Sequence, residues 1–333
     1  MSLRFAFRSY RRPLRAPLRT AHGLWTEREG LLLRAEGEGG VVRYGEVAPI
    51  PWFGTETLEE AREVCGKLGD TLNAGALAAV PERMACVRFA LANLIDGALR
   101  PTTASGERAR LPVAALLPAG RAALDVFATR LEAGFLAFKW KVGVARAEEE
   151  LPLLDDLLAR LPPFAKLRLD ANGAWSNRDA TRWLESCAER PIEFVEQPVM
   201  QEDALMGLAE DYPVKLALDE SVTGLATARE WQARGWPGLF VIKPALAGPL
   251  DELVAWTRET KPDLVLSSAI ESALARAQIL RVAFAEKLTT RPLGFGVGEI
   301  FGDRTWDGPP VGPLLDASWC DGVDAEALWN AAS

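Results

Sequence analysis

The sequence predicts an α/β protein in which a (β/α)7β barrel of the TIM type follows a small N-terminal α+β capping domain. Two observations in the later part of the chain predict the barrel. Eight short apolar runs follow residue 105, with stretches of helical periodicity between them, as in repeated βα units. Polar residues near the ends of six of these runs recur every 23 to 29 residues. The first hundred residues instead combine alternating strand-like runs with two amphipathic segments, which predicts the separate capping domain.

Composition narrows the class of protein. The chain has 333 residues, of which 49% are hydrophobic and 25% charged, and its net charge is −8. No basic surplus favours nucleic acid as a partner, and no apolar run is long enough to predict a membrane helix. Four scattered cysteines without a CxxC pair are typical of a reducing compartment, so we expect a cytoplasmic protein. Because the chain has a single histidine, we expect lysine or carboxylate groups to transfer protons if the protein is an enzyme.

The capping domain is expected over residues 1–105. Its first twenty residues hold six arginines and no acid, a composition also found in organelle transit peptides, but the alternation over residues 3–8 favours an edge strand. Residues 30–49 predict two further strands joined by a turn near residues 36–40. A helix is expected over residues 55–73, capped by Thr55 or Thr57, and another over residues 81–100 with Pro81 at its start.

The barrel is expected over residues 106–333, with a C-terminal segment that packs back on the cap. The predicted strands lie in the runs 111–117, 135–143, 166–173, 192–199, 214–221, 239–245, 264–272 and 293–299. An open doubly wound sheet is the alternative. The count of eight and the absence of a GxGxxG turn after a strand favour the closed barrel.

Three acidic residues end consecutive apolar strands of this barrel. Asp170, Glu196 and Asp219 would therefore converge at the carboxyl ends of the strands, where barrels of this type place their active sites. Unpaired carboxylates so close together repel each other, and a divalent cation relieves that repulsion. Oxygen ligands without histidine or thiolate favour Mg²⁺, or else Mn²⁺. The alternative is that each acid merely caps the helix that follows it.

Lysines flank the three acids on both sides. In "FKWKVG", residues 138–143, period-two alternation sends Lys139 and Lys141 to the face opposite Phe138 and Trp140, while Lys243 comes from a later strand, "FVIKP". A half-exposed strand would also explain the alternation. Beside a metal site, however, neighbouring cations lower the pKa of a lysine toward neutrality, which allows that lysine to remove a proton.

The motifs "KWK", "LDANGAW", "VEQP", "LDES" and "VIKP", in this order, resemble the enolase superfamily, and specifically its muconate-lactonizing-enzyme-like branch. The resemblance covers nearly the whole chain. It implies that the three acids bind Mg²⁺ and that Lys141 and Lys243 are catalytic residues flanking the α-carbon of a carboxylate substrate. The groups implied to orient the metal ligands are Asn172, Gln197 and Glu220.

Two stretches, "REGLLLRAEGEGGVVRYGEVAPIPWFGTET" and "SSAIESALA", resemble o-succinylbenzoate synthases within this branch. That likeness implies a Mg²⁺-dependent lyase of menaquinone or phylloquinone biosynthesis. The reaction would be the syn-dehydration of 2-succinyl-6-hydroxy-2,4-cyclohexadiene-1-carboxylate to 2-succinylbenzoate. N-acylamino acid racemases and dipeptide epimerases share both lysines and remain alternatives. The epimerases usually carry an Asp-x-Asp after the eighth strand, where this chain has only Glu299 and Asp303 nearby. A ligand-binding barrel without turnover is a third alternative.

The same resemblance suggests which residues contact the substrate. Lys139 would neutralise the substrate carboxylate, and Ser267 or Ser268 would hold the succinyl group, unless these serines only close the seventh strand. His22 and Trp25 lie in the segment 20–30, which would cover the pocket from the cap, although an exposed loop position is the alternative for His22. The expected partner is thus a small carboxylate, with neither nucleic acid nor membrane involved.

Overall fold

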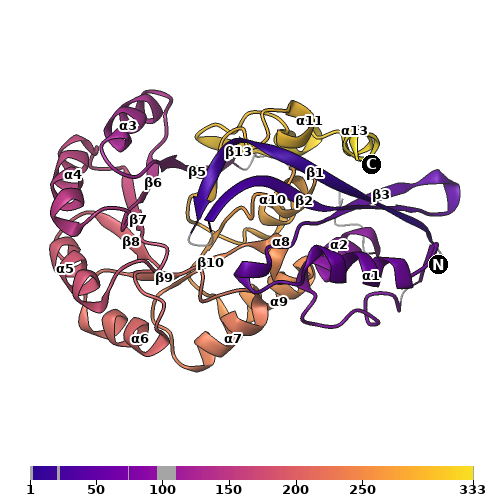
Figure 1. Ribbon diagram of the computed structural model, residues 1–333, viewed down its shortest axis with the longest axis horizontal. Coiled ribbons are helices and arrows are strands. Elements are labelled where there is room, and N and C mark those ends of the chain that lie inside the picture. The colour runs from indigo at the N-terminus through magenta and orange to yellow at the C-terminus, as the bar shows by residue number, and fades with distance from the viewer. Residues whose placement is uncertain (1–2, 21–22, 74, 96–109, 333) are drawn as a thin grey trace.

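The computed structural model describes residues 3–20, 23–73, 75–95 and 110–332. The cap contains an antiparallel sheet with the strand order β3-β2-β1-β4. Its strands are β1 (Leu3–Thr20), β2 (Gly23–Glu36), β3 (Val42–Val47) and β4 (Thr71–Leu72). The strands predicted over residues 3–8 and 30–49, and the turn between the latter two, are confirmed. β1 is not an edge strand, however, because β4 pairs with its start. β4 also lies within the helix predicted over residues 55–73, which ends at Lys67 because Gly69 has a φ of 69°. β1 and β2 form a long hairpin that extends from the cap toward the barrel (Figure 1).

Two helices complete the cap. α1 (Leu58–Lys67) begins after Thr57, whose hydroxyl accepts from the backbone of Glu60 while the Glu60 carboxylate accepts from that of Thr57. α2 (Ala85–Ile95) begins four residues later than the Pro81 start predicted from the sequence. The reason is that the buried Glu56 carboxylate accepts from Val87 N at 2.8 Å and so caps the helix from another segment. Short 3-10 turns are η1 (Glu38–Gly40) and η2 (Pro51–Phe53).

Eight parallel strands form the barrel, as predicted. They are β5 (Arg110–Leu117), β6 (Ala137–Lys141), β7 (Lys166–Asp170), β8 (Ile192–Glu196), β9 (Leu216–Leu218), β10 (Leu239–Ile242), β11 (Leu264–Leu266) and β12 (Leu293–Gly296). β5 pairs with β12 at one side, and a parallel bridge between Ser267 and Gly294 joins β11 to β12. These contacts close the ring and exclude the open doubly wound sheet.

Helices surround this ring (Figure 1). They are α3 (Ala122–Glu132), α4 (Ala147–Arg160), α5 (Asn177–Cys187), α6 (Glu202–Asp211), α7 (Leu225–Ala233), α8 (Pro244–Ala247), α9 (Leu250–Thr260) and α10 (Ala273–Glu286). The alternation in β6 follows from this arrangement. Phe138 packs on Phe127 of α3 at 4.5 Å between ring centroids, and Trp140 packs on Trp183 of α5 at 6.2 Å. The apolar face of β6 thus meets the helices, and its lysines lie on the barrel's inner face.

The segment after β12 returns to the cap through α11 (Arg304–Asp307), β13 (Leu314–Asp316), α12 (Ser318–Asp321) and α13 (Ala325–Ala331). β13 pairs antiparallel with β5. On the cap sheet, the Arg8 guanidinium lies over the ring of Trp329 at 4.5 Å and donates to the Trp329 carbonyl at 2.9 Å. The predicted junction at residues 105 and 106 lies outside the described residues.

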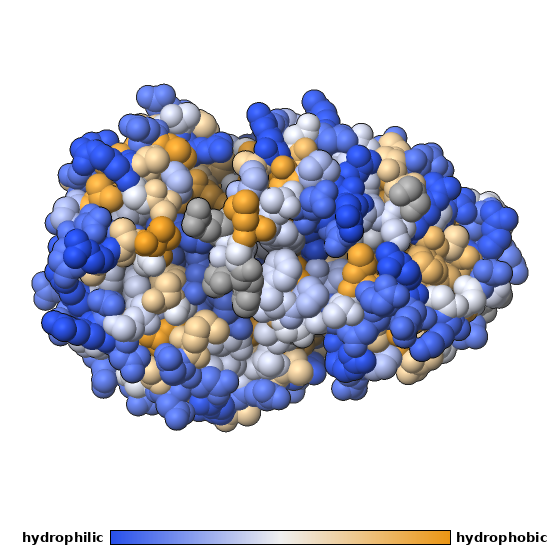
Figure 2. Space-filling view, viewed as in Figure 1, coloured by the Kyte–Doolittle hydropathy of each residue, from blue (hydrophilic) through white to orange (hydrophobic). Residues whose placement is uncertain are grey.

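The face seen in Figure 2 is hydrophilic over much of the outer helices, with several hydrophobic residues between the barrel and the cap hairpin. None of the described helices has the length and apolar character needed to cross a membrane.

Candidate active site

The three predicted acids lie side by side at the carboxyl ends of adjacent strands. Asp170 is the last residue of β7 and is in register with Glu196, the last residue of β8. Asp219 directly follows β9. All three are buried, which makes their charges costly unless a cation balances them.

Lys139 lies among these acids. Its ammonium is 2.9 Å from Asp170 Oδ2 and 2.6 Å from Glu196 Oε1. Burial alone would lower the pKa of Lys139, but the carboxylates of Asp170, Glu196 and Asp219 outweigh burial and raise this pKa. The sequence suggested a direct contact between Lys139 and the substrate; the structure pairs it with two of the expected metal ligands, because their strand ends are its nearest neighbours on the inner face.

The electrostatics of the acids indicate a site for a cation. Burial raises the pKa of Glu196 well above its usual value, and the charges of Asp170 and Asp219 add to the effect. Burial also acts to raise the pKa of Asp219, but Lys243 and Lys139 outweigh it and lower that pKa. Among the described residues, no three acidic, histidine or cysteine side chains are grouped as metal ligands; Asp170 and Glu196 pair with Lys139, and Asp219 pairs with Lys243. The buried, all-oxygen donor set nevertheless fits Mg²⁺.

The two predicted catalytic lysines differ in their partners. Lys141 is the last residue of β6, in register with Asp170, and its side chain makes no hydrogen bond or ion pair with any described residue. Lys243 directly follows β10 and forms an ion pair with Asp219. Lys141 therefore has no partner in the described part of the chain, whereas Lys243 is held by a carboxylate, and the two lysines lie on opposite sides of the three acids along the sheet.

The residues expected to orient the metal ligands form hydrogen bonds around two of the three acids. Asn172 donates from its side chain to Glu220 Oε1 at 3.0 Å and from its backbone to Asp170 Oδ1 at 3.1 Å. Gln197 Oε1 accepts from Asp219 N at 3.0 Å. Asn172 and Gln197 have φ values of 45° and 38°, which are uncommon for residues other than glycine. Burial and the charge of Asp219 raise the pKa of Glu220 to about 7. The turns after β7 and β8, which carry Asn172 and Gln197, thus hold Asp170 and Asp219 in position.

The predicted substrate contacts have structural partners. Ser267 Oγ donates to Gly294 O at 3.4 Å beside the barrel closure, and Ser268 Oγ donates to the Glu271 carboxylate at 3.1 Å. In this structure both hydroxyls therefore form hydrogen bonds at the end of the seventh strand, as the alternative interpretation of these serines expects. Trp25 lies on β2 with its ring 5.1 Å, edge-on, from that of Trp52. His22 lies outside the described residues.

Sequence reasoning missed three cap residues that reach the barrel. The buried Arg28 guanidinium donates to Ile270 O at 3.1 Å and to Pro49 O at 2.7 Å, which ties the cap to the loop after β11. Glu46 accepts from Ser272 N at 3.0 Å, at the start of α10. Phe53 places its ring under the Lys243 ammonium, 4.0 Å from ring centroid to Nζ. The one signal in the sequence was that all three residues lie within residues 28–57, the cap stretch that resembles o-succinylbenzoate synthases.

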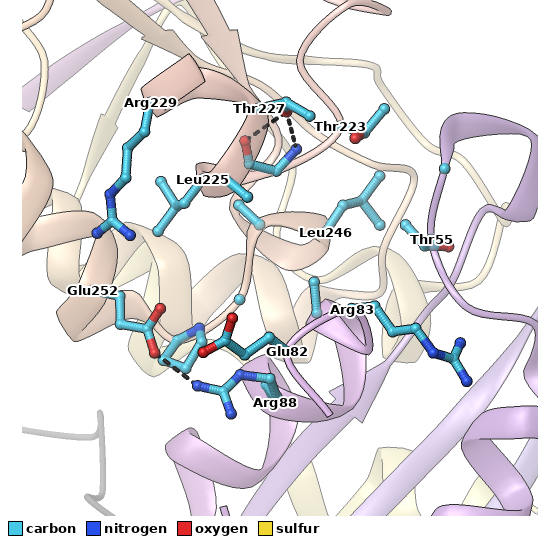
Figure 3. Close-up of a pocket in the computed structure, with 17 residues that line it drawn as sticks. Thr55, Glu82, Arg83, Arg88, Thr223, Leu225, Thr227, Arg229, Leu246 and Glu252 are labelled. Atoms are coloured by element: carbon cyan, nitrogen blue, oxygen red, sulfur yellow. Dashed lines mark hydrogen bonds and ion pairs between the residues drawn. The ribbon is translucent and has the colours of Figure 1, made fainter. Parts of the chain in front are cut away.

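A separate cavity of about 240 Å³ lies on the seam between cap and barrel (Figure 3). Its lining includes Thr55 and Arg88 from the cap and Thr223, Thr227 and Glu252 from the barrel. Arg88 and Glu252 form an ion pair across it at 2.8 Å. None of the predicted site residues lines this cavity, so it is distinct from the acid and lysine site.

Comparison with known proteins identifies the family. Residues 123–288 match the family model described as "Enolase C-terminal domain-like". A protein of Thermosynechococcus vestitus named o-succinylbenzoate synthase is 43% identical over 336 residues, covering 98% of this chain and 99% of that protein. The chain belongs to the o-succinylbenzoate synthase family of the enolase superfamily. The family predicted from the sequence motifs is therefore confirmed.

Solved structures of similar proteins agree with the fold. The crystal structure of an o-succinylbenzoate synthase from Thermosynechococcus elongatus BP-1, with Mg in its active site, has a TM-score of 0.84 and 40% identity over 98% of this chain and 99% of that chain. An N-succinyl Arg/Lys racemase of Bacillus cereus has a TM-score of 0.79 but only 19% identity, over 95% of this chain and 93% of that one. The second likeness shows the fold alone.

Proposed function

We propose that this protein is a Mg²⁺-dependent o-succinylbenzoate synthase of menaquinone or phylloquinone biosynthesis. It converts 2-succinyl-6-hydroxy-2,4-cyclohexadiene-1-carboxylate to 2-succinylbenzoate and water. The observation that carries the proposal is the 43% identity to an o-succinylbenzoate synthase over 98% of the chain. Three acids and two flanking lysines at the strand ends supply the groups that the reaction needs.

Asp170, Glu196 and Asp219 would hold the Mg²⁺ ion, as the buried oxygen donors on adjacent strands. A bound Mg²⁺ supplies Lewis-acid stabilisation of the charge that develops on the substrate carboxylate. Asn172 and Gln197 hold Asp170 and Asp219 in position through hydrogen bonds, and Glu220 in turn accepts a hydrogen bond from Asn172.

Lys141 is the proposed base and acid. As a neutral amine it removes the α-proton, and as the resulting ammonium it returns that proton to the departing hydroxyl, so that water leaves and the ring becomes aromatic. One residue serves both steps because a syn-elimination takes the proton and the hydroxyl from the same face. The absence of an ion pair at Lys141 in the described part of the chain leaves its nitrogen available for this transfer.

Lys243 is the proposed electrostatic catalyst. Its ammonium would lie at the other face of the substrate ring and stabilise the enediolate anion. Lys139 balances the acids, and we propose that it also faces the substrate carboxylate. Ser267 and Ser268 remain proposed contacts of the succinyl group, because their hydroxyls can donate hydrogen bonds to a carboxylate. His22 and Trp25 remain proposed substrate contacts in the segment that would cover the pocket.

The racemase and epimerase alternative finds less support. Glu299 forms an exposed ion pair with Arg15, and Asp303 accepts from Thr305 N at 2.9 Å as the cap of α11. These two acids after the eighth strand thus already have partners, and they do not form the Asp-x-Asp that would hold a substrate ammonium. A barrel without turnover is not favoured, since all three acids and both lysines are present.

The expected site of action is the cytoplasm. The four cysteines are free and buried in the structure, which fits a reducing compartment.

A product assay tests the function. The purified enzyme is incubated with Mg²⁺ and the cyclohexadiene acid, and in parallel with an N-succinylamino acid. We expect aromatisation with kcat/KM above ~10⁴ M⁻¹s⁻¹, loss of activity on chelation, and recovery when Mg²⁺ returns. Faster racemisation with negligible aromatisation would transfer the assignment to the racemases.

A further inference from the structure

Phe53 contacts one of the two lysines that the sequence places at the reaction centre. Its ring centroid lies 4.0 Å from Lys243 Nζ, and the only other described partner of that ammonium is the Asp219 carboxylate. Phe53 belongs to the cap and Lys243 to the barrel, so this contact crosses the domain interface at the site.

The turn that carries Phe53 is fixed at both ends. Phe53 N donates to Ile50 O at 2.8 Å, and Ile50 N donates to Thr55 Oγ1 at 2.7 Å. Gly54 follows with φ of +88°, and a Cβ there would lie 2.9 Å from Thr223 Cγ2 of the barrel. Only glycine allows the turn to sit this close to the loop after β9. The ring of Phe53 is therefore held in place by the docking of the cap.

The barrel side of the contact is equally constrained. Lys243 is the residue before Pro244, which opens α8, and α8 packs against α2 of the cap. The side chain of Lys243 is only 13% exposed. A buried ammonium needs partners, and an aromatic face supplies partial negative charge without a proton acceptor. Because Asp219 is also a proposed metal ligand, its carboxylate would be shared with the metal, so the ring of Phe53 is the partner of Lys243 that does not depend on the metal.

We propose that Phe53 is a positioning residue, which holds the Lys243 ammonium between its own ring and the substrate ring. This inference rests on the proposed function for the role of Lys243, but the contact itself does not depend on the substrate. Docking of the cap would thus place a cation at the reaction centre, in addition to covering the pocket.

Kinetics of matched variants test the proposal. Phe53→Leu keeps an apolar side chain but removes the aromatic face, and we expect kcat to fall about tenfold with KM changed less than about twofold. Phe53→Tyr and Phe53→Trp keep an aromatic face and should retain most of kcat. Phe164→Leu, the same substitution at an exposed position before β7, is the control and should leave both constants unchanged.

A double-mutant cycle separates positioning from packing. In a Lys243→Ala background, followed by long incubations, Phe53→Leu should lower kcat less than about twofold, because the group it positions is gone. An undiminished tenfold effect in that background would overturn the proposal and assign Phe53 to packing or direct substrate contact.

A spectroscopic experiment tests the contact between Phe53 and Lys243 in the absence of substrate. The chain has eight lysines, so an enzyme labelled at the lysine ε-carbons gives a resolvable spectrum, in which Lys243→Arg identifies one signal. We expect the ε-protons of Lys243 to be shifted upfield by the ring, and Phe53→Leu, but not Phe164→Leu, to abolish the shift. An unshifted signal in the folded wild type would refute the contact. If the Lys243 signal shows the expected upfield shift but the enzyme fails to aromatise the cyclohexadiene acid, the contact is confirmed and the proposed function is refuted.

Discussion

Replacement of Lys141 tests the chemistry most directly, because the structure predicts little cost to folding. The Lys141 side chain has no ion pair or hydrogen bond among the described residues, so its removal leaves no buried charge without a partner. We therefore expect Lys141→Ala to change the free energy of unfolding by less than about 1 kcal/mol. Lys139 is different, since its removal would leave Asp170 and Glu196 without their cation.

The expected loss of activity follows from the two proton transfers assigned to Lys141. Removal of a general acid or base typically costs ~10²–10⁴ in rate, which is about 2.7–5.4 kcal/mol in the barrier. Because the same nitrogen takes the proton and returns it, we expect Lys141→Ala to lie at the upper end of this range. Lys141→Arg should be as inactive, since a guanidinium does not release its proton near neutral pH.

The assay is the rate of aromatisation at saturating Mg²⁺, with thermal unfolding measured on the same samples. Lys166→Arg, the same substitution at the opposite end of the adjacent strand β7, is the matched control and should keep wild-type kcat. A folded Lys141→Arg enzyme with more than about a tenth of wild-type kcat would refute the assignment, because general-base removal costs far more. Lys243 would then be the next candidate for the base.

Three further predictions concern other residues. Lys243→Ala should lower kcat/KM by ~10²-fold or more, whereas Lys243→Arg should retain more activity than Lys141→Arg because its role needs only charge; equal loss in both arginine variants would contradict this difference. Glu193→Gln should destabilise the fold by about 3–5 kcal/mol in urea titrations at pH 7, because it leaves the buried Arg168 guanidinium, 2.6 Å away, without its counter-charge. Burial acts to raise the pKa of Glu193, but Arg168 and its other cationic neighbours outweigh burial and lower it, so this stability is present above pH 4.5 and lost as the pH falls; a variant as stable as wild type at pH 7 would contradict the argument. Burial raises the pKa of the Cys320 thiol to about 12, and all four cysteines are buried. Ellman's reagent at pH 8 should therefore react with the cysteines only after unfolding, and the free energy of unfolding should fall as the pH rises above 9. Rapid reaction of the native enzyme with the reagent would refute this prediction.

Sequence reasoning predicted positions correctly where local periodicity alone determines them. A polar residue at the end of an apolar run has only one edge of a parallel barrel to occupy, so the sequence could place Asp170, Glu196 and Asp219 at neighbouring strand ends. The alternation in residues 138–143 likewise fixed which face of β6 the lysines occupy.

The missed features depend on how the domains dock. Phe53 and Lys243 are 190 positions apart, and nothing in either local pattern predicts that their side chains meet. The late start of α2 has the same origin, since Glu56 caps it from a different segment. Whether Lys139 meets a metal ligand or the substrate depends on side-chain rotamers, which strand periodicity does not encode.

The packing of α13 on the cap has a consequence for biosynthesis. Arg8 contacts Trp329, 321 positions later in the chain, and Arg12 donates to Ala331 O at 2.9 Å. At about 5–20 residues per second, a ribosome needs roughly 16–64 s to add the residues between Arg8 and its partner. The first strand of the cap therefore keeps one surface uncovered until α13, the last of the described helices, has been made. A nascent chain should need shielding of that surface throughout elongation, and shortening the chain before residue 325 should impair the cap rather than the barrel.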